Sequence, residues 1–369
     1  MPKYIPLLLC FIFTVPFVAA QDAAKIRQSM DKGVAFLRTT QSSTGGWSAS
    51  PRTGIGPTAV ILAGLLNAGV GIDDPMIVNG LKLLEASTRK DGGVYTPDGF
   101  FQNYETCVAI MCFAKANEAA KKKDGSEPYK GLLAGAEKYL RAQQYTEDLG
   151  TRPEEPNYGG VGYGGTTRPD LSNTQYFLDA LKATGAKEND PAIQRALVFV
   201  SRSQNLESEY NTMPYIARNA ENLDGGFIYG TPAPEADTTG QSLRSYGAMT
   251  YAGLKSMIYA GLTKEDKRVQ AALEWIAKNY TVIENPGRGA AGLYYYYQTM
   301  TKALDVQGLP VLEDSGGKKH NWRNDISEHL ISVQKENGSW VNADSRQYME
   351  DDANLVTGFA LLALTLCVP

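Results

Sequence analysis

Hydrophobic positions recur along the chain at helical spacing, in segments of two alternating kinds. Residues 23–39 place apolar side chains every three or four positions, which predicts an amphipathic helix. Residues 58–65 and 356–364 are apolar nearly throughout, as expected of buried helices. The pattern therefore predicts pairs of helices, in which an outer amphipathic helix precedes a buried inner helix.

A glycine turn closed by an aromatic or β-branched residue separates the two helices of a pair. The turns are Gly45-Gly46-Trp47, Gly92-Gly93-Val94, Gly159-Gly160-Val161, Gly225-Gly226-Phe227 and Gly338-Ser339-Trp340, with a degenerate copy at residues 287–292. We expect a positive φ at one glycine of each turn, and we expect the residue after the glycines to pack into the adjacent repeat. Self-similarity at a period of several tens of residues is the signature of a repeat protein.

Six such pairs can be placed along the chain. The predicted outer helices are 23–39, a segment around 81–84, 132–142, a segment starting near 192, 269–278 and 322–334; the predicted inner helices are 58–65, 104–116, 172–183, 245–260, 293–304 and 356–364. A single pair cannot bury both of its helices, so neighbouring pairs must stack. Because the inner helices are more apolar than the outer ones, we predict a closed ring forming one all-α domain over residues 22–369.

The first twenty residues have the features of a targeting segment. Lys3 supplies a positive start, residues 5–17 are apolar, and Val18-Ala19-Ala20 fits a small-residue cleavage site. The apolar stretch is short for a membrane span. We predict a signal peptide over residues 1–20, a secreted or periplasmic protein, and no membrane span after cleavage.

Net charge and cysteine content exclude several classes of function. The formal net charge of −4 argues against a nucleic-acid partner, which would require a basic surface. Beyond the leader, Cys107, Cys112 and Cys367 form neither a disulfide framework nor a metal-binding spacing. We expect buried, inert thiols, and we predict no cofactor and no metal.

The two complete turns carry a family resemblance. Gln-x-x-x-Gly-x-Trp occurs at Gln41/Gly45/Trp47 and at Gln334/Gly338/Trp340, with weaker forms at Thr88/Gly92/Val94 and Glu221/Gly225/Phe227. Followed by an inner helix that begins with threonine, this QW motif resembles the terpenoid cyclase and protein prenyltransferase superfamily, in particular its squalene-cyclase-like repeat proteins. The resemblance covers nearly the whole chain after the leader. It implies an α/α toroid, an (α/α)6 barrel of six helical hairpin repeats around a central cavity.

The catalytic residues of that superfamily are not found in this sequence. We align the inner helices on their anchor positions, Thr58, Thr106, Thr174, Thr250, Tyr297 and Thr357. Squalene–hopene-type cyclases carry an Asp-x-Asp-Asp motif just before one anchor, and the nearest match is Asp170-Leu171-Ser172-Asn173, in which Ser172 replaces the proton donor. Serine is too weak an acid to protonate an alkene. The zinc ligands of the prenyltransferases are also missing, so we carry over the fold and not the activity.

Tyrosines and arginines near the inner helices are candidate ligand-binding residues. Tyr176, Tyr246, Tyr294, Tyr295 and Tyr297 could line a cavity that binds an apolar chain or a sugar ring; alternatively, these rings fill the toroid. Arg52, Arg168 and Arg244 each precede an anchor by six residues. They could form an anion site where the inner helices begin, or each could tie its loop to a neighbouring turn.

Acidic residues also gather near the starts of inner helices. Asp170, Asp237, Asp351 and Asp352 are candidate catalytic residues, since two converging carboxyl groups can cleave a glycan. The alternative is that they cap helices.

These observations lead to three hypotheses. The leading one is an exported toroid that binds an apolar, isoprenoid-like molecule in its cavity. The alternatives are a secreted glycan-active (α/α)6 enzyme with paired carboxylates, and a non-catalytic scaffold for protein contacts. The lining of the cavity discriminates among them, because each hypothesis requires a different set of side chains there.

Overall fold

The structure is a computed structural model that describes residues 15–48, 53–165, 167–218, 220–231 and 243–368. As predicted, it is mostly helical. The outer helices are α1 (Val15–Thr40), α3 (Pro75–Ala86), α5 (Lys130–Arg141), α7 (Pro191–Arg202), α10 (Lys267–Asn279) and α12 (Trp322–Val333). The inner helices are α2 (Gly56–Asn67), α4 (Gln102–Asp124), α6 (Leu171–Ala183), α9 (Gly247–Tyr259), α11 (Leu293–Gln307) and α13 (Ala353–Thr365).

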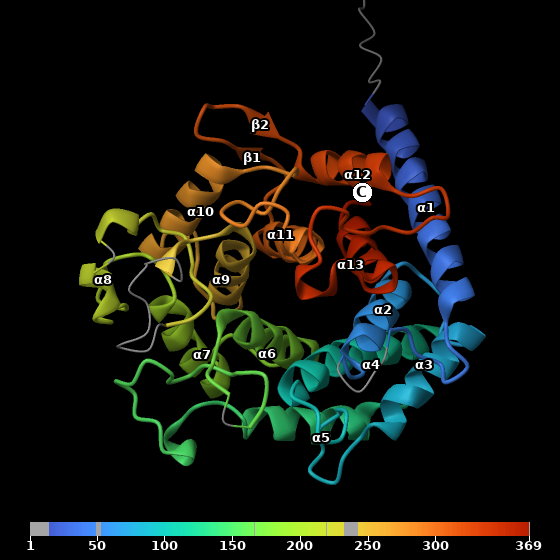
Figure 1. Ribbon diagram of the computed structural model, residues 1–369, viewed down its shortest axis with the longest axis horizontal. Helices are drawn as coiled ribbons and strands as arrows, with labels where there is room; N and C mark the ends of the chain where they lie inside the picture. The colour runs from blue at the N-terminus through green and yellow to red at the C-terminus, as the bar shows by residue number, and fades with distance from the viewer. Residues whose placement is uncertain (1–14, 49–52, 166, 219, 232–242, 369) are drawn as a thin grey trace, which may run out of the picture.

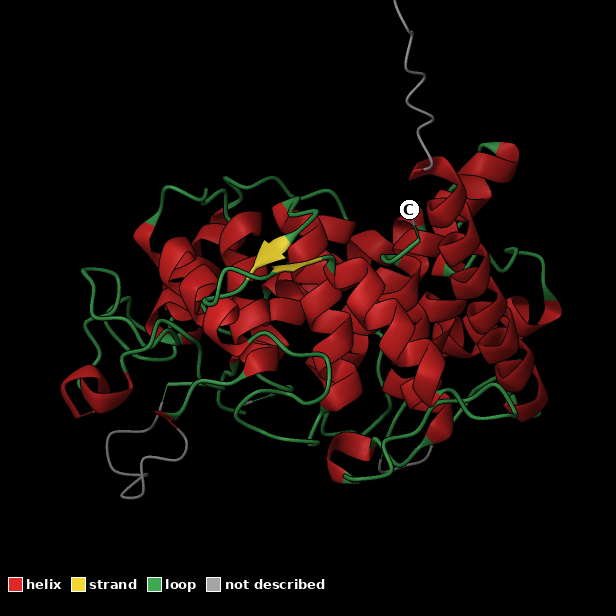
Figure 2. Ribbon diagram, turned by 90° about the horizontal axis from the view of Figure 1, so that it is seen from above, coloured by secondary structure: helices red, strands yellow, loops and turns green. Residues whose placement is uncertain are grey.

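Short elements occupy the connections. They are the helix α8 (Tyr215–Arg218), the 3-10 helices η1 (Glu147–Leu149), η2 (Ala220–Asn222) and η4 (Gln347–Met349), and the strands β1 (Leu312–Glu313) and β2 (Lys319–His320). The two strands pair antiparallel, with Leu312 opposite His320. Figure 2 shows this hairpin beside the layer of helices.

The inner helices contact one another in a closed cycle (Figure 1). Helix α2 packs between α13 and α4, α6 packs between α4 and α9, and α11 packs between α9 and α13. The outer helices cover this cycle: α3 packs on α2, α5 on α4, α7 on α6, α10 on α9, and α12 on α11 and α13. Helix α1 packs on α12 and α13, so the first and last helices of the described chain are neighbours.

A threonine near the start of five inner helices fastens the preceding turn. The Thr58 hydroxyl accepts a hydrogen bond from the Trp47 backbone N–H at 3.0 Å. The same bond joins Val94 to Thr106, Val161 to Thr174, Phe227 to Thr250 and Trp340 to Thr357. In α11 the anchor is Tyr297, and its phenol donates instead to the Val282 carbonyl at 2.7 Å.

Four glutamines connect a turn to the outer helix of the next pair. The Gln41 side-chain amide donates to the carbonyls of Gly45 and Met76, both at 2.8 Å. Gln144 bonds in the same way to Gly159 and Ala192, Gln204 to Gly225 and Arg268, and Gln334 to Gly338 and Ser29. The glutamine of the fourth pair is therefore Gln204, and the predicted match at Glu221 is wrong, since Glu221 is exposed in η2. An insertion between Gln204 and its glycine turn had hidden this match in the sequence.

The last turn closes the cycle onto the first helix. Gly338 has a φ of +88°, and a Cβ atom there would lie 2.3 Å from the Lys32 carbonyl oxygen of α1. Only glycine fits both the backbone conformation and the close approach. Together with the bonds of Gln334, this contact joins segments about three hundred residues apart in the sequence.

Two predicted boundaries differ from the structure. The second inner helix, predicted to end at residue 116, extends to Asp124 in α4, where Lys121, Lys122 and Lys123 lie at the negative end of the helix dipole. Helix α1 begins at Val15, so the expected cleavage after Ala20 falls within it, and residues 1–14 lie outside the described part. None of the described helices combines the length and apolar character needed to cross a bilayer.

Three of the cysteines lie within the described ranges. Cys107, Cys112 and Cys367 are buried and unpaired. Burial raises the pKa of each thiol, which makes them poor nucleophiles.

Candidate functional site

A cavity of about 460 Å³ lies where the inner helices begin, within the range of small-molecule sites. In five inner helices, the residue two positions before the anchor lines it. These residues are Tyr104, Ser172, Ala248, Tyr295 and Leu355. Equivalent positions meet around one axis because the inner helices run in the same direction.

Aromatic rings from four helices form a belt around the cavity. The ring centroids of Tyr104 and Tyr176 are 5.3 Å apart, those of Tyr176 and Tyr295 are 6.1 Å apart, and those of Tyr295 and Phe359 are 6.2 Å apart. Such spacings are typical of favourable aromatic pairs. The belt links α4, α6, α11 and α13, and it offers an apolar surface with a few hydroxyl groups at its edge.

Loop residues complete the lining. They include Phe101, Tyr163, Tyr229, Arg288 and Tyr348. The Arg288 guanidinium carbon lies 4.5 Å from the Tyr246 ring centroid, a cation–π distance. Among the described lining residues, Arg288 is the only charged side chain. The wall is therefore aromatic and uncharged apart from this one cation.

A strained segment holds the edge of the cavity. Tyr348 and Met349 have φ angles of 60° and 62°, a left-handed conformation that non-glycine residues rarely adopt. The next residue, Glu350, is fully buried and accepts hydrogen bonds from the backbone N–H groups of Leu293, Tyr294 and Tyr295 at 2.7, 2.7 and 3.0 Å. Burial raises the pKa of Glu350, and these bonds oppose the shift. The carboxylate thereby fixes the start of α11 and the position of Tyr295.

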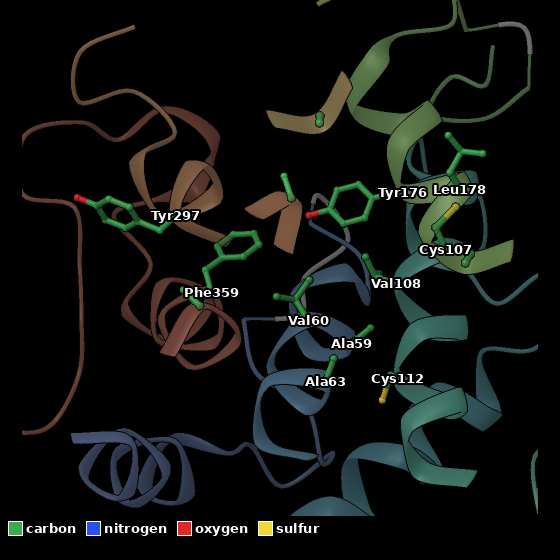
Figure 3. Packing of buried hydrophobic residues seen from close by; sticks show 14 of the residues in the cluster. Ala59, Val60, Ala63, Cys107, Val108, Cys112, Tyr176, Leu178, Tyr297 and Phe359 are labelled. Atoms are coloured by element: carbon green, nitrogen blue, oxygen red, sulfur yellow. The ribbon is translucent and has the colours of Figure 1, made fainter. Parts of the chain in front are cut away.

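The structure divides the predicted tyrosines into two groups. Tyr176, Tyr246 and Tyr295 line the cavity, whereas Tyr294 and Tyr297 are buried elsewhere. Figure 3 shows Tyr297 pointing away from Tyr176 and Phe359. Four consecutive helical residues project in all directions around the axis, so the tyrosine run could not face one cavity.

Tyr176 and Phe359 of the belt join Val60 and Val108 in a layer of apolar side chains that crosses the ring. Figure 3 shows Val60, Val108, Tyr176 and Phe359 converging from α2, α4, α6 and α13. Each lies two positions after its anchor. This layer separates the aromatic cavity from a second hollow near the C-terminal ends of the inner helices.

The second hollow, of about 520 Å³, is polar on one side. The residues five positions after the anchor face it: Ala63, Met111 and Leu362 on one side, and Asp179 and Lys302 on the other. At the same position in α9 stands Lys255, whose side chain is completely buried. Lysines at this end suit the negative ends of the helix dipoles.

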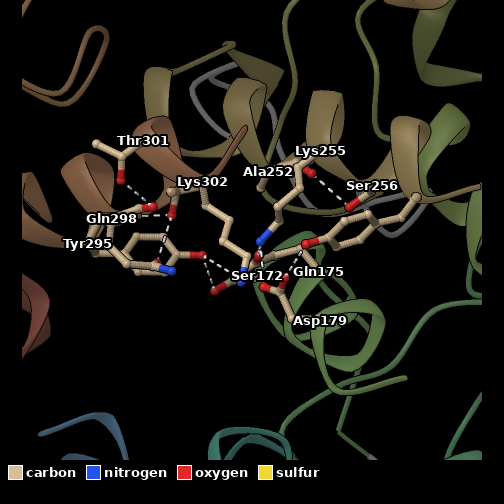
Figure 4. A network of polar contacts seen from close by, with 12 residues as sticks. Ser172, Gln175, Asp179, Ala252, Lys255, Ser256, Tyr295, Gln298, Thr301 and Lys302 are labelled. Atoms are coloured by element: carbon tan, nitrogen blue, oxygen red, sulfur yellow. Dashed lines mark hydrogen bonds and ion pairs between the residues drawn. The ribbon is translucent and has the colours of Figure 1, made fainter. Parts of the chain in front are cut away.

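Lys255 and Asp179 form the centre of a polar network (Figure 4). The Lys255 ammonium donates to Asp179 Oδ2 at 2.5 Å and to Gln175 Oε1. Tyr259 donates to Asp179 Oδ1 at 3.1 Å, and the Lys302 ammonium lies 3.9 Å from the same oxygen. Burial lowers the pKa of Lys255, and the Asp179 carboxylate opposes this shift.

The predicted anion site is not assembled among the described residues. Arg168 and Arg244 are exposed, and neither lines the cavity. Arg52 lies outside the described residues. Arg288, which the sequence did not single out, is the cation at the cavity.

The predicted acids are mainly helix caps. Asp170 accepts hydrogen bonds from the Asn173 backbone N–H at 2.8 Å and from the Asn173 side-chain amide at 2.7 Å. Asp352 accepts from the backbone of Asn354 at 2.9 Å and of Leu355 at 3.3 Å. Asp351 is exposed, and Asp237 lies outside the described residues. Of these four acids, the three that the structure describes do not line the cavity.

The buried cap Asp170 makes stability depend on pH. Burial raises the pKa of Asp170 to about 6, above the usual unfolded value near 4. The folded state therefore holds this proton over a range in which the unfolded state has lost it, and ionisation of Asp170 destabilises the fold as the pH rises. As the pH rises from about 4 to about 7, we expect the free energy of unfolding of Asp170→Asn to increase by on the order of 1–3 kcal/mol relative to that of the wild type.

Urea unfolding of both proteins across that range measures this difference. Among the described residues, the buried Asn173 side-chain oxygen has no hydrogen-bond partner, so a rotated Asn173 amide can accept a bond from the new amide. A difference between the two proteins that does not change with pH would contradict the prediction.

Several residues of the site were not identified from the sequence. Tyr104 could have been found from the alignment, because it occupies the same position relative to its anchor as Ser172 and Tyr295. The same alignment, extended five residues past each anchor, brings Asp179, Lys255 and Lys302 together. Loop residues such as Tyr163, Tyr229, Arg288 and Tyr348 have no such periodic signal.

Comparisons with known proteins identify solved structures with a similar fold. No protein-family model and no curated protein matches the chain. The apo structure of the type II terpene cyclase MstE from Scytonema is 12% identical over 93% of this chain and 98% of its own, with a TM-score of 0.53. A protein from Actinoplanes is 12% identical over 93% of this chain and 100% of its own, with a TM-score of 0.50. The chain thus has a helical fold similar to that of a terpene cyclase.

Proposed function

We propose that this chain is an exported α/α toroid, an (α/α)6 barrel of six helical hairpins, that binds an apolar, isoprenoid-like molecule in its aromatic cavity. The belt of Tyr104, Tyr176, Tyr295 and Phe359 carries this proposal. Belt and cavity together offer an apolar chain a large contact surface. The terpene-cyclase-like fold favours an isoprenoid over other apolar molecules.

The arrangement of helices supports six hairpins. Each inner helix contacts two inner neighbours in a closed cycle, and the glutamine bonds link successive pairs in the same way. Residues 1–20 have the features of a cleaved leader, which supports export.

Cyclase chemistry is not part of the proposal. Ser172 lines the cavity at the position that corresponds to the proton-donating aspartate of squalene–hopene-type cyclases. No carboxyl group occurs among the described lining residues. Protonation of an alkene needs a positioned strong acid. The cavity instead suits binding, with Arg288 at its edge able to contact a polar or anionic end of the ligand.

The two alternative hypotheses find less support. Glycan cleavage needs two facing carboxyl groups, whereas Asp170 and Asp352 cap helices and do not line the cavity. A pure scaffold needs no internal binding space, and the cavity of about 460 Å³ therefore argues against it.

Native mass spectrometry of the protein from the exported fraction of its host tests the proposal. We expect a polypeptide mass that starts at Gln21, together with a stoichiometric apolar molecule that solvent extraction releases. A chain that keeps its leader would refute cleavage after Ala20, and absence of the protein from the exported fraction would refute export. A ligand-free protein that also fails to take up added isoprenoids would refute the binding function.

A bulky residue in the cavity should block binding. Ala291 lines the cavity and Ala290 does not, although they are adjacent and similarly half-buried. We expect Ala291→Trp to weaken binding of a saturated isoprenoid by at least about tenfold, or roughly 1.4 kcal/mol, because the indole occupies the space of the ligand. Titration calorimetry measures the change, with Ala290→Trp as the matched control. Equal affinities of the two variants would place the ligand elsewhere.

A further inference from the structure

A chain of hydrogen bonds runs from the buried ion pair to the wall of the aromatic cavity (Figure 4). Lys255 donates to Gln175 Oε1, and the Gln175 side-chain nitrogen lies 3.2 Å from the Tyr295 phenol oxygen. That phenol lies 2.9 Å from the Ser172 hydroxyl. Tyr295 and Ser172 both line the cavity, whereas Gln175 and Lys255 are fully buried. The chain thus connects a charge in the protein interior to two hydroxyl groups at the ligand site.

Lys255 determines which groups donate and which accept along this series of hydrogen bonds. An ammonium group has three donors and no acceptor, and the Asp179 carboxylate keeps a negative partner at 2.5 Å from it. The Gln175 amide must therefore turn its oxygen toward Lys255, which leaves its N–H group to donate to Tyr295. The opposite orientation would bring two donors together. The amide orientation, which coordinates alone often leave ambiguous, is here determined by chemistry.

Counting protons then leaves one hydroxyl hydrogen without an acceptor. Burial raises the pKa of Tyr295, so the phenol keeps its proton, and Ser172 carries another. One of these two protons forms the bond between the two hydroxyl groups. The Tyr295 oxygen already accepts from Gln175. The Thr299 hydroxyl is also close to the phenol, but it donates to the Tyr295 carbonyl at 2.9 Å, and the hydrogen bonds of the described residues join neither Tyr295 nor Ser172 to a further acceptor. The second proton is available to the cavity.

We propose that the ligand of the aromatic cavity is an oxygenated isoprenoid, whose carbonyl, ether or hydroxyl oxygen accepts a hydrogen bond from the Ser172–Tyr295 pair. This inference rests on the proposed function and adds a polar recognition point to it. A hydrocarbon in the same place leaves that donor unpaired, and an unpaired buried donor weakens binding. The aromatic belt contacts the apolar chain on either side of the oxygen.

Two matched ligands test the inference. Hexahydrofarnesyl acetone is a saturated isoprenoid ketone that can only accept hydrogen bonds, and the hydrocarbon of the same carbon skeleton differs from it at that group alone. We expect the wild type to bind the ketone about three- to tenfold more tightly, the effect of one hydrogen bond. Calorimetric titration of the mature protein with each compound measures the ratio.

Gln175→Glu reverses the donor and acceptor roles in the hydrogen bond between residues 175 and 295, and the side chain keeps almost the same shape. A carboxylate at this position accepts from both Lys255 and Tyr295, so the phenol proton turns away from the cavity and the Ser172 proton takes its place between the hydroxyl groups. We expect the preference for the ketone to fall to one or below, because the buried ketone oxygen then lacks a donor, while the hydrocarbon still binds. Gln194→Glu makes the same substitution at an exposed residue of α7 and should keep the wild-type ratio.

A second variant keeps the inference testable if Gln175→Glu does not fold. The double variant Ser172→Ala/Tyr295→Phe removes both hydroxyl groups, and its ketone preference should also disappear. Equal binding of the two compounds by the wild type would overturn the inference and leave the proposed function standing, since it would show that water satisfies the donor. If neither compound binds, the proposed function fails and the inference with it.

Discussion

Replacing Lys255 with methionine is expected to lower the free energy of unfolding by about 3–5 kcal/mol. The substitution leaves the Asp179 carboxylate buried with one fewer partner, because Tyr259 and the more distant Lys302 are its remaining contacts. An uncompensated buried charge costs more than the lost attraction itself. Gln175 also loses the donor for its side-chain oxygen, which adds to the loss.

Urea unfolding near neutral pH measures the change, with Lys138→Met as the control at an exposed position of α5. The double variant Lys255→Met/Asp179→Leu should recover much of the loss, since removing both charges leaves no isolated ion. A stability of Lys255→Met equal to that of the wild type would show that Lys302 alone neutralises Asp179.

Gly159→Ala is expected to destabilise the protein by about 2–5 kcal/mol. Gly159 has a φ of +82°, and a Cβ atom there would lie 1.9 Å from the Arg195 carbonyl oxygen of α7. Left-handed backbone costs a non-glycine residue about 1–2 kcal/mol, and the forced shift of a packed helix adds the remainder. The turn would also move away from Gln144, which donates to the Gly159 carbonyl at 2.9 Å.

Gly150→Ala separates these two contributions. Gly150 lies in the same connection with a φ of +76°, but no atom of the described part of the chain lies within 4 Å of the position its Cβ would take. We therefore expect the backbone cost alone, about 1–2 kcal/mol. Denaturant midpoints of the two variants give the comparison, and similar losses would mean that the turn does not need its close contact with α7.

Much of the helical architecture could be predicted from local pattern. The apolar periodicity located five of the inner helices to within a few residues, whereas α4 extends well beyond its predicted end at residue 116. The glycine turns separated the inner helices from the outer ones. The threonine anchors then aligned the repeats, and Ser172, which this alignment set at the position of the cyclase proton donor, lines the cavity. These features follow from spacing along a single segment, so no knowledge of distant contacts was needed.

The site was harder to predict because it is made by several helices at once. Tyr294 and Tyr297 lie within two positions of Tyr295 in sequence, yet of these three only Tyr295 lines the cavity. The orientation of α11 is set by packing and by the distant Glu350. Asp179 and Lys255 become partners only when α6 and α9 are neighbours. Gln204 escaped notice because an insertion moved its turn away along the chain.

The closure of the ring also has a consequence for how the chain folds. Gln334 contacts Ser29, and Gly338 lies against Lys32, so the first helix has its main partners at the other end of the sequence. Contacts between such distant segments slow folding, because a long stretch of chain must be ordered before they can form. During synthesis α1 would remain without α12 and α13 until the last repeat has been made. Until then, the contacts that α1 makes with the last repeat contribute nothing to the stability of the chain.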